Sequence, residues 1–250
     1  MNQRRSQIEE LVNREGTLSF AQLKQAFPDV SEMTLRSDLR ALDEERRIVR
    51  VYGGARSLGN LVGTDDAFDL RASRNAEGKR LIVKKALKYL RPGMSVFLDS
   101  GSTAIHMASQ FPDDSYMVFT SGINCALELA KLKNVRSHLI GGEINRNSLC
   151  VNGARSISEI GRLNFNIAFL GTTGYSERTG FNCAVEAEAE LKRAIISRSE
   201  QVVVLMDSQK VGRVNPFTFA EPGEIHAVIT DAGLEEGLAQ HFRQAGTVLL

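Results

Sequence analysis

The spacing of apolar residues changes near residue 57, and this change constrains the fold more than any other feature of the sequence. Before it, apolar side chains recur at intervals of three and four residues, as at Ile8 and Val12, which is typical of amphipathic helices. After it, short β-branched or apolar runs alternate with helical stretches. We therefore expect a helical domain over 1–57, a linker over 58–75 and an α/β domain over 76–250.

The second part of the chain has the pattern of a mostly parallel sheet with helices on both faces. Its apolar runs are short and continuous, as strands buried on both sides require. The expected strands span residues 95–98, 117–120, 138–140, 167–170, 202–206, 228–230 and 248–250. The expected helices span residues 77–90, 102–110, 122–131, 154–161, 187–198 and 234–244. A sheet of this kind binds its ligands at the carboxyl ends of its strands.

The overall charge gives no general attraction to nucleic acid. The chain is 42% hydrophobic and 24% charged, and its 31 Lys and Arg residues nearly balance 30 Asp and Glu residues. Any affinity for DNA must therefore come from the local placement of basic side chains. The first residues lack the apolar core of a signal peptide, and no run reaches the roughly 18–20 apolar residues of a membrane span. We expect a cytoplasmic protein that does not enter a membrane.

Cysteine, histidine and glycine usage points to neither a metal nor a cofactor. Cys125, Cys150 and Cys183 lack close pair spacing and are expected to be small buried thiols in a reducing compartment. The four histidines show no metal-ligand spacing. Gly78-Lys79 lacks the Gly-rich loop and the following hydroxyl of a P-loop, and no dinucleotide-binding glycine motif or nucleophile elbow is present. We expect no cofactor and no catalytic residue.

Residues 29–45, DVSEMTLRSDLRALDEE, have the pattern of a DNA-recognition helix. Ser31 is a good N-cap for a helix over 32–45, and a shorter helix over 19–27 precedes it, which gives a helix-turn-helix. The positions expected to lie largely inward are Met33, Leu35, Leu39 and Leu42. In this motif the second helix enters the major groove, where Arg suits guanine and Ser or Thr can contact bases or phosphates.

The segment RIVRVYGGAR at 47–56 predicts a basic wing, because a short strand is followed by a Gly53-Gly54 turn with arginines on both sides. An amphipathic helix with surface arginines is usually only a solvated helix. A helix, a turn, a second helix and a wing within 57 residues together favour DNA binding. The residues expected to contact DNA are Ser31, Met33, Thr34, Arg36, Ser37, Arg40, Arg50, Tyr52 and Arg56.

Small and hydroxyl-bearing residues follow several expected strands of the second domain. In FLDSGSTAIHMA, at 97–108, a strand ends, the chain turns at Gly101 and a helix begins near Ser102, where free N–H groups favour an anion. Such a segment alone is as often a plain strand–helix turn. The same composition recurs at Thr120-Ser121 and at Gly171-Thr172, and Lys210 follows a further strand. Together these segments predict a polar rim that binds an anion.

Lys192 has two interpretations. It lies on the helix after the Gly171 loop and could point toward the polar rim. It could equally be a surface lysine that pairs with Glu188, four residues before it on the same helix. The spacing does not decide between them.

Over nearly its whole length the sequence also resembles the DeoR family of transcriptional regulators. The resemblance is carried by RRSQIEELV, VSEMTLRSDLRALDEERRIVRVYGGA, FLDSGSTA, LIGGEINRNSLCVNGA and the stretch from FLGTTGYSERTGF to EAELKRAIISRSEQVVVLMDSQKVG. It implies an amino-terminal winged helix-turn-helix and a carboxyl-terminal domain that resembles ribose-5-phosphate isomerase. The family commonly has two adjacent arginines in the recognition helix, whereas Ser37 follows Arg36 here, so one contact to DNA is missing or comes from a hydroxyl.

The resemblance also implies a function. It indicates a repressor of carbohydrate-metabolism genes whose partners are a double-stranded DNA operator and a phosphorylated sugar, and which assembles as a homo-oligomer, a dimer or a tetramer. The alternative is a sugar-phosphate isomerase with an appended DNA-binding-like domain. The isomerase has a general-base carboxylate in a helix segment whose counterpart here reads ELKRAII, so we expect binding without turnover. The residues expected to bind the effector are Asp99, Gly101, Ser102, Thr103, Thr120, Ser121, Gly171, Thr172, Lys192 and Lys210.

Overall fold

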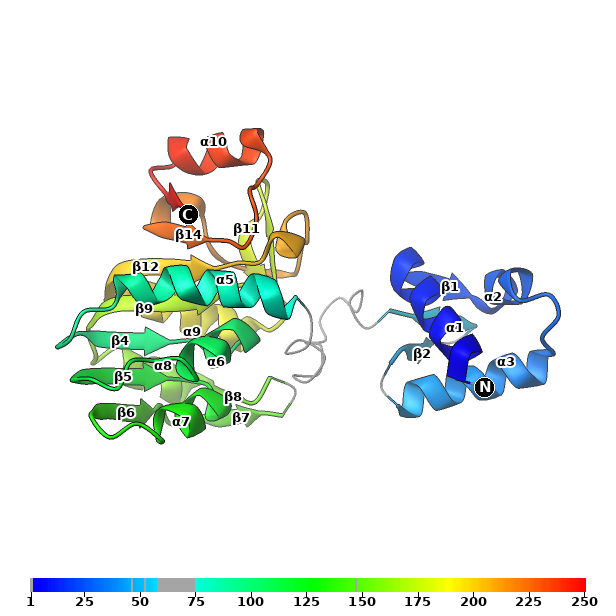
Figure 1. Ribbon diagram of the computed structural model, residues 1–250, viewed down its shortest axis with the longest axis horizontal. Coiled ribbons are helices and arrows are strands. Elements are labelled where there is room, and N and C mark those ends of the chain that lie inside the picture. The colour runs from blue at the N-terminus through cyan, green and yellow to red at the C-terminus, as the bar shows by residue number, and fades with distance from the viewer. Residues whose placement is uncertain (1, 46, 52, 58–74, 147) are drawn as a thin grey trace. The chain divides into compact units, whose positions relative to one another are not determined.

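The chain forms two compact units, Met1–Asp66 and Ala67–Leu250. The structure is a computed structural model that describes every residue except 1, 46, 52, 58–74 and 147 (Figure 1). Nearly all of the linker expected at 58–75 lies outside the described residues, and so does Tyr52. The position of that linker therefore stays a prediction.

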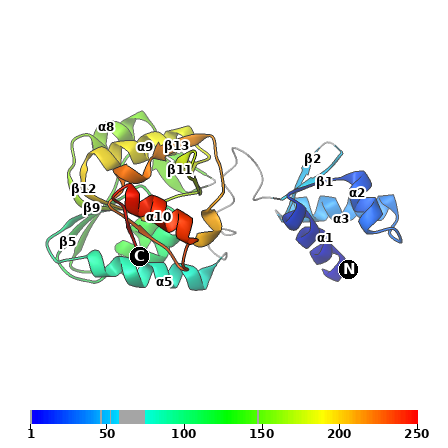
Figure 2. The same ribbon diagram turned by 90° about the horizontal axis from the view of Figure 1, so that it is seen from above.

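The amino-terminal unit consists of helices packed against a small antiparallel sheet of order β1-β3-β2 (Figure 2). Its helices are α1 (Asn2–Glu15), α2 (Phe20–Ala26) and α3 (Glu32–Glu44), and its strands are β1 (Thr17–Ser19), β2 (Val49–Val51) and β3 (Gly54–Arg56). Helices α2 and α3 form the expected helix-turn-helix, and β2 and β3 form the wing. Strand β1, which the sequence pattern does not reveal, joins the wing to the turn between α1 and α2.

Polar contacts fix the turn between α2 and α3. Ser31, the expected N-cap of α3, accepts a hydrogen bond from the Thr34 amide at 3.2 Å. The Lys24 ammonium donates to the carbonyl oxygens of Pro28 and Val30, both at 2.8 Å. Because these contacts satisfy the backbone of the turn, the direction in which α3 leaves it is well defined.

The buried side of α3 differs from the expected one at its first turn. Leu35, Leu39 and Leu42 are buried as expected, but Met33 is 82% exposed, so the prediction that Met33 points inward is wrong. The reason is helical geometry: at 3.6 residues per turn, a residue two positions before Leu35 lies on the opposite side of the helix. The additional buried position is occupied by Asp38.

Asp38 is a buried carboxylate that joins α3 to α1. Its oxygens accept hydrogen bonds from Arg4 Nε at 2.6 Å and from Arg5 Nε at 3.1 Å. Burial by itself raises the pKa of Asp38, but the hydrogen bonds and charges of the two guanidinium groups outweigh it and lower the pKa below its ordinary value of 3.8. A charged contact therefore fixes α3 on α1.

The carboxyl-terminal unit is built on a seven-stranded sheet of order β15-β14-β12-β9-β4-β5-β6, in which all neighbours pair in parallel. Its strands are β4 (Ser95–Leu98), β5 (Tyr116–Thr120), β6 (Val135–Leu139), β9 (Phe165–Gly171), β12 (Ser199–Leu205), β14 (Ala227–Ile229) and β15 (Val248–Leu249). Each expected strand begins and ends within three residues of the observed strand. The parallel sheet is confirmed.

Helices cover both faces of this sheet, as expected (Figure 2). The helices are α5 (Ala76–Ala86), η2 (Leu87–Tyr89), α6 (Ser102–Ala108), α7 (Ile123–Leu129), α8 (Ala154–Ile160), α9 (Glu186–Ser197), η3 (Ser208–Lys210), η4 (Pro222–Glu224) and α10 (Glu236–Gln244). Val96 and Leu98 of β4 belong to the core beneath α5, α6 and α7, whereas Phe97 belongs to the core shared with α8, α9 and α10. Successive side chains of one strand thus enter separate cores.

Two smaller antiparallel elements are not visible in the sequence pattern. One is the hairpin of β7 (Glu143–Asn145) and β8 (Cys150–Asn152), and the other is a sheet of β10 (Gly174–Ser176), β11 (Gly180–Cys183) and β13 (Phe217–Ala220). Their strands are only three or four residues long, which is too short for an alternating pattern to stand out.

The order of the strands reverses between β4 and β9. From β4 the chain adds β5 and β6 on one side, and then it crosses back to add β9, β12, β14 and β15 on the other. In an open parallel sheet, ligands bind at the carboxyl ends of the strands beside such a reversal. The loops that follow β4 and β9 therefore mark the expected position of a ligand site.

We expect Asp38→Asn to lower the free energy of unfolding of the full-length chain by about 1.5–3 kcal/mol, the usual contribution of hydrogen bonds to a charged group. Because the pKa of Asp38 is lowered in the folded state, its contribution is present above pH 3.8 and is lost as the pH falls through the folded-state pKa. Chemical denaturation at neutral pH and at about pH 3 measures both effects. Glu44→Gln removes the same charge from an exposed position of α3 and is the control. Equal destabilisation by Asp38→Asn at both pH values would contradict the assignment.

Candidate functional site

The exposed side of α3 carries most of the side chains expected at DNA. Met33, Ser37 and Arg40 are exposed and are spaced by four and three residues, so they share the face opposite the buried leucines. Ser31 is exposed at the start of the helix, and its hydroxyl lies 2.8 Å from that of the half-buried Thr34. These two hydroxyls form the cap, so the centre of the face is left to the other three residues.

Arg36 lies at the edge of the same face. Its guanidinium carbon is 4.2 Å from the centroid of the Phe20 ring on α2. The Glu32 carboxylate is 3.9 Å away, and both partners of this pair are largely exposed. Exposed pairs contribute little, so the stacking on Phe20 is the contact that orients Arg36.

The wing adds a further cation. Arg50 is exposed, and its backbone amide donates to Asp43 Oδ1 at 2.9 Å, which ties β2 to the end of α3. Gly54 leaves no room for a side chain, since a Cβ there would lie 2.1 Å from the Leu18 carbonyl oxygen. Tyr52 and the Arg56 side chain lie outside the described residues.

A polar pocket lies at the carboxyl ends of β4, β9 and β12, beside the reversal in strand order. It is lined by Asn75, Lys79, Gly101, Ser102, Thr103, Ala104, Gly171, Thr172, Thr173, Leu205, Asp207, Gln209, Lys210 and Arg213. The structure therefore brings together the loops after β4 and β9 and the turn η3, as the sequence leads us to expect.

Three cationic residues line this pocket. Lys79 is buried on α5, Lys210 is half-buried on η3, and Arg213 is exposed. Ser102 adds a hydroxyl group at the start of α6. Asp207 is the one acidic residue in the lining as described, so the pocket has an excess of positive charge.

Asp231 joins the starts of the two elements that carry Lys79 and Lys210. It accepts a hydrogen bond from Asn75 Nδ2 at 2.7 Å, at the start of the helix that carries Lys79. It also accepts one from the Ser208 amide at 2.8 Å, at the start of the turn that carries Lys210. Burial acts to raise the pKa of Asp231, but these hydrogen bonds outweigh it and lower the pKa. The carboxylate therefore stays charged and joins α5 to η3.

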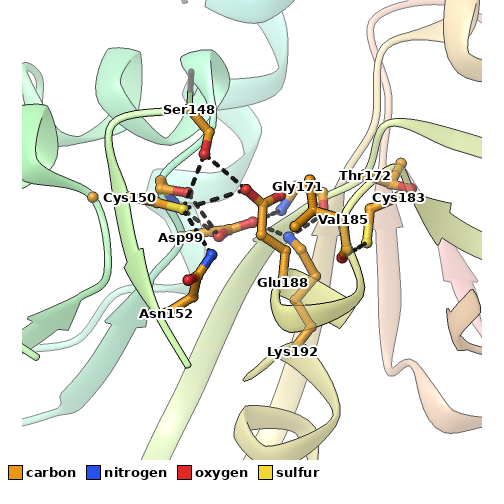
Figure 3. Close-up of polar contacts among 12 residues, drawn as sticks. Asp99, Ser148, Cys150, Asn152, Gly171, Thr172, Cys183, Val185, Glu188 and Lys192 are labelled. Atoms are coloured by element: carbon orange, nitrogen blue, oxygen red, sulfur yellow. Dashed lines mark hydrogen bonds and ion pairs between the residues drawn. The ribbon is translucent and has the colours of Figure 1, made fainter. Parts of the chain in front are cut away.

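Asp99 and Lys192 form a buried ion pair behind the pocket (Figure 3). Lys192 Nζ donates to Asp99 Oδ2 and, at 2.8 Å, to the Gly171 carbonyl oxygen, while the Gly171 amide donates to Asp99 Oδ2 at 2.8 Å. The interpretation of Lys192 as a surface lysine is therefore wrong. Neither Asp99 nor Lys192 lines the pocket, so the pair supports the loop after β9 and lies behind the surface that a ligand would meet.

Both members of this pair are charged near neutral pH. Burial by itself raises the pKa of Asp99, but the Lys192 ammonium outweighs it and the pKa is lowered. Burial also acts to lower the pKa of Lys192, but the Asp99 carboxylate outweighs it and the pKa is raised. Mutual attraction and further hydrogen bonds to the backbone offset the cost of removing two charges from water.

Glu188 lies four residues before Lys192, but its hydrogen bonds go to the β7–β8 hairpin (Figure 3). Its Oε1 accepts hydrogen bonds from the Ser148 hydroxyl at 2.7 Å and from the Cys150 thiol at 3.3 Å. Burial, together with the Glu188 charge, raises the pKa of Cys150 to about 12, so this group is a neutral thiol. Leu149, which lies between Ser148 and Cys150 in the chain, has a φ of 49°, a left-handed conformation that is uncommon outside glycine.

Other expected ligand residues have internal roles. Thr120 and Ser121 are buried at the end of β5 and do not line the pocket, and the Thr120 hydroxyl accepts a hydrogen bond from the Gly122 amide at 3.0 Å. Thr172 does line the pocket, but its hydroxyl donates to the Gly174 carbonyl at 2.6 Å. The pocket is therefore lined from the ends of β4, β9 and β12 and from α5, and Thr120 and Ser121 lie outside its lining.

Sequence reasoning missed two cations of the pocket. Lys79 follows Gly78 in a segment that lacks the features of a P-loop, and it reaches the pocket from α5, which precedes β4. Arg213 follows η3 in a segment without a periodic pattern. The one signal that could have indicated Arg213 is its proximity in sequence to Lys210.

The expected small buried thiols are present, since Cys125, Cys150 and Cys183 are buried and free. Across the described ranges, no three or more His, Cys, Asp or Glu side chains gather in a way that could hold a metal ion. In the same part of the chain, no helix combines the length and the apolar character that crossing a membrane requires.

Comparison with known proteins matches both units to models of one family. A DeoR-like helix-turn-helix domain matches residues 4–60, and a DeoR C terminal sensor domain matches residues 74–232. Likeness to solved structures is partial. A ribose 5-phosphate isomerase from Methanocaldococcus jannaschii shares 16% identity over 55% of each chain with a TM-score of 0.41. A translation initiation factor eIF-2B from Pyrococcus horikoshii shares 15% identity over 64% of each chain with a TM-score of 0.46.

Relatives match the chain over nearly its full length. The HTH-type transcriptional regulator GlpR of Haloferax volcanii is 31% identical over 99% of this chain and 96% of its own. A putative aga operon transcriptional repressor of Escherichia coli O157:H7 is 27% identical over 100% of this chain and 93% of its own. The lactose phosphotransferase system repressor of Staphylococcus epidermidis is 28% identical over 91% of each chain. With both of its units matched, the chain belongs to the DeoR family of transcriptional regulators.

Proposed function

We propose that this regulator represses carbohydrate-metabolism genes, that α3 and the wing contact its DNA operator, and that a phosphorylated sugar binds in the pocket beside β4 and β9. The names of two relatives support the first part, since one is a repressor of an aga operon and the other a repressor of a lactose phosphotransferase system. The exposed face of α3, with Arg36 and Arg40, supports the second part.

The convergence of Lys79, Lys210 and Arg213 on one small polar pocket is the observation that carries the proposal of a phosphorylated ligand. A phosphate group carries close to two negative charges, and ammonium, guanidinium and hydroxyl donors are the groups that bind it most strongly. Asp207 and Gln209 line the same pocket and can exchange hydrogen bonds with sugar hydroxyls. A small phosphorylated polyol or sugar is the ligand class that fits both the three cations and the pair of Asp207 and Gln209.

The same geometry favours binding without turnover. An enediol isomerisation needs a base that reaches the carbon-bound proton of the substrate. In the ELKRAII segment, the buried charged side chain is Lys192, and its ammonium is committed to Asp99 and to the Gly171 carbonyl. We therefore propose that the pocket is a sensor and is not an active site.

Repression that responds to a sugar also needs an oligomer that binds the operator and a coupling between sugar binding and DNA binding. We propose that the protein is cytoplasmic and forms a homo-oligomer, a dimer or a tetramer. The assembly presents paired α3 helices to repeated half-sites of the operator. The sugar must bind one arrangement of the assembly more tightly than another, and couplings of this kind are typically about 1–3 kcal/mol.

A phosphorylated sugar that binds the pocket should raise the melting temperature of the full-length protein, whereas its unphosphorylated counterpart should not. Lys210→Ala and Arg213→Ala should each weaken that binding by roughly 10- to 100-fold, because each removes a charged hydrogen bond to phosphate. A thermal-shift panel of sugars and sugar phosphates, followed by titration of the active compound, measures both effects.

Lys133→Ala removes an exposed cation from elsewhere in the same unit and is the matched control. Equal shifts for the wild type and both pocket variants would place the site elsewhere. Interconversion of pentose phosphates by the purified wild-type protein would overturn the proposal that the pocket does not catalyse.

Arg40→Ala should weaken binding to operator DNA by roughly 5- to 150-fold if the side chain reads a base, and binding to unrelated DNA should change little. If Arg40 contacts only phosphate, both affinities should fall together and the salt dependence should become shallower. Fluorescence anisotropy with operator and random duplexes separates the two outcomes. Arg14→Ala, an exposed arginine on α1, is the control, and an unchanged affinity in Arg40→Ala would reject α3 as the DNA-contacting helix.

Lys192→Met should lower the free energy of unfolding by about 3–5 kcal/mol, because it leaves the buried Asp99 carboxylate without its partner. The double substitution Asp99→Asn with Lys192→Met should recover much of that loss, because no buried charge remains. Denaturant unfolding of the wild type, both single variants and the double variant completes a double-mutant cycle. Additive effects would show that the two residues do not act as a pair.

A further inference from the structure

We propose that Met33 reads the C5-methyl group of a thymine in the operator. This inference rests on the proposed placement of α3 at DNA and adds to it the identity of one base contact. It starts from an apolar side chain that the fold does not use: Met33 is 82% exposed, the most exposed large apolar residue in the described part of the chain.

Nothing on α3 itself covers Met33. The neighbouring hydroxyls of Ser31 and Thr34 are hydrogen-bonded to each other and to the helix start. Arg36, one turn further on, is held over the Phe20 ring at 4.2 Å, toward α2. The methionine side chain therefore extends from the first turn of the helix into open space.

Its position on the helix is that of a base-contacting residue. Met33, Ser37 and Arg40 lie on one line along the helix, opposite Leu35 and Leu39. A recognition helix contacts base edges with the residues of its amino-terminal half, and Met33 is in the first turn. The residues of this line thus meet successive base pairs, with Met33 at the end that enters the groove.

The chemistry of the groove then limits what Met33 can recognise. The base edges in the major groove offer hydrogen-bond donors and acceptors and one apolar group, the thymine methyl. A methionine has no hydrogen-bond donor and only a weak acceptor, so it gains little at guanine, cytosine or adenine. Its long unbranched chain can adapt to a methyl group that lies away from the helix axis. A thymine is therefore the base that this position favours.

The experiment removes the methyl group from the DNA and the side chain from the protein. Binding sites are first selected by the full-length protein from random duplexes, and each thymine of the selected site is then replaced singly by uracil, which lacks only the methyl. For the wild type we expect one thymine per half-site at which uracil weakens binding, by about fourfold for one buried methyl. Met33→Ala should bind the parent site less tightly and should lose that dependence, whereas Met33→Leu should keep part of it.

Control variants distinguish a failure of the Met33 contact from a failure of the proposed placement of α3 at DNA. Leu127→Ala, which removes another exposed apolar side chain, should behave like the wild type. If Arg40→Ala weakens binding but Met33→Ala retains the full affinity and the full uracil effect, α3 contacts DNA and Met33 does not read the methyl. If neither substitution weakens binding, the placement of α3 has failed. A wild-type protein that tolerates uracil at every thymine would also overturn the inference, as would a Met33→Ala variant that changes only self-association.

Discussion

The ion pair between Asp99 and Lys192 is the interaction on which the sensor unit depends. It joins three elements that the chain places far apart: the end of β4, the end of β9 through Gly171, and the middle of α9. Because both charges are buried, either residue alone would be costly, and together they fix the two loops that flank the reversal of the sheet. Glu188 extends this polar centre to the β7–β8 hairpin through Ser148.

Around that centre, the cations of the pocket come from elements outside the strands. Lys79 belongs to α5 and Lys210 to η3, and Asp231 hydrogen-bonds the starts of both. Helix α5 is the first described element of the sensor unit after residues 58–74.

Helix α3 has one side that is packed against its unit and one side that is exposed. Asp38 holds α3 on α1 through Arg4 and Arg5, and Leu35 and Leu39 fill the core beside it. These contacts set the rotation of α3 about its own axis. The direction in which its exposed residues point is thereby determined by contacts on its buried side.

The sequence by itself determined the two-part organisation, the helix-turn-helix and the parallel sheet. These follow from local signals: apolar periodicity, the Ser31 cap and the hydroxyl-rich turns after strands such as Gly101-Ser102. Local signals also placed part of the pocket, since its loops adjoin strand ends. Pairing across the fold was decided only in three dimensions. Lys192 could be read as exposed or buried until its distant partner was known, and Lys79 gave no signal because it enters the pocket from another layer. The outward direction of Met33 was obscured for a different reason: an apolar residue counts as core by its type, although its spacing from Leu35 already places it on the opposite side of the helix.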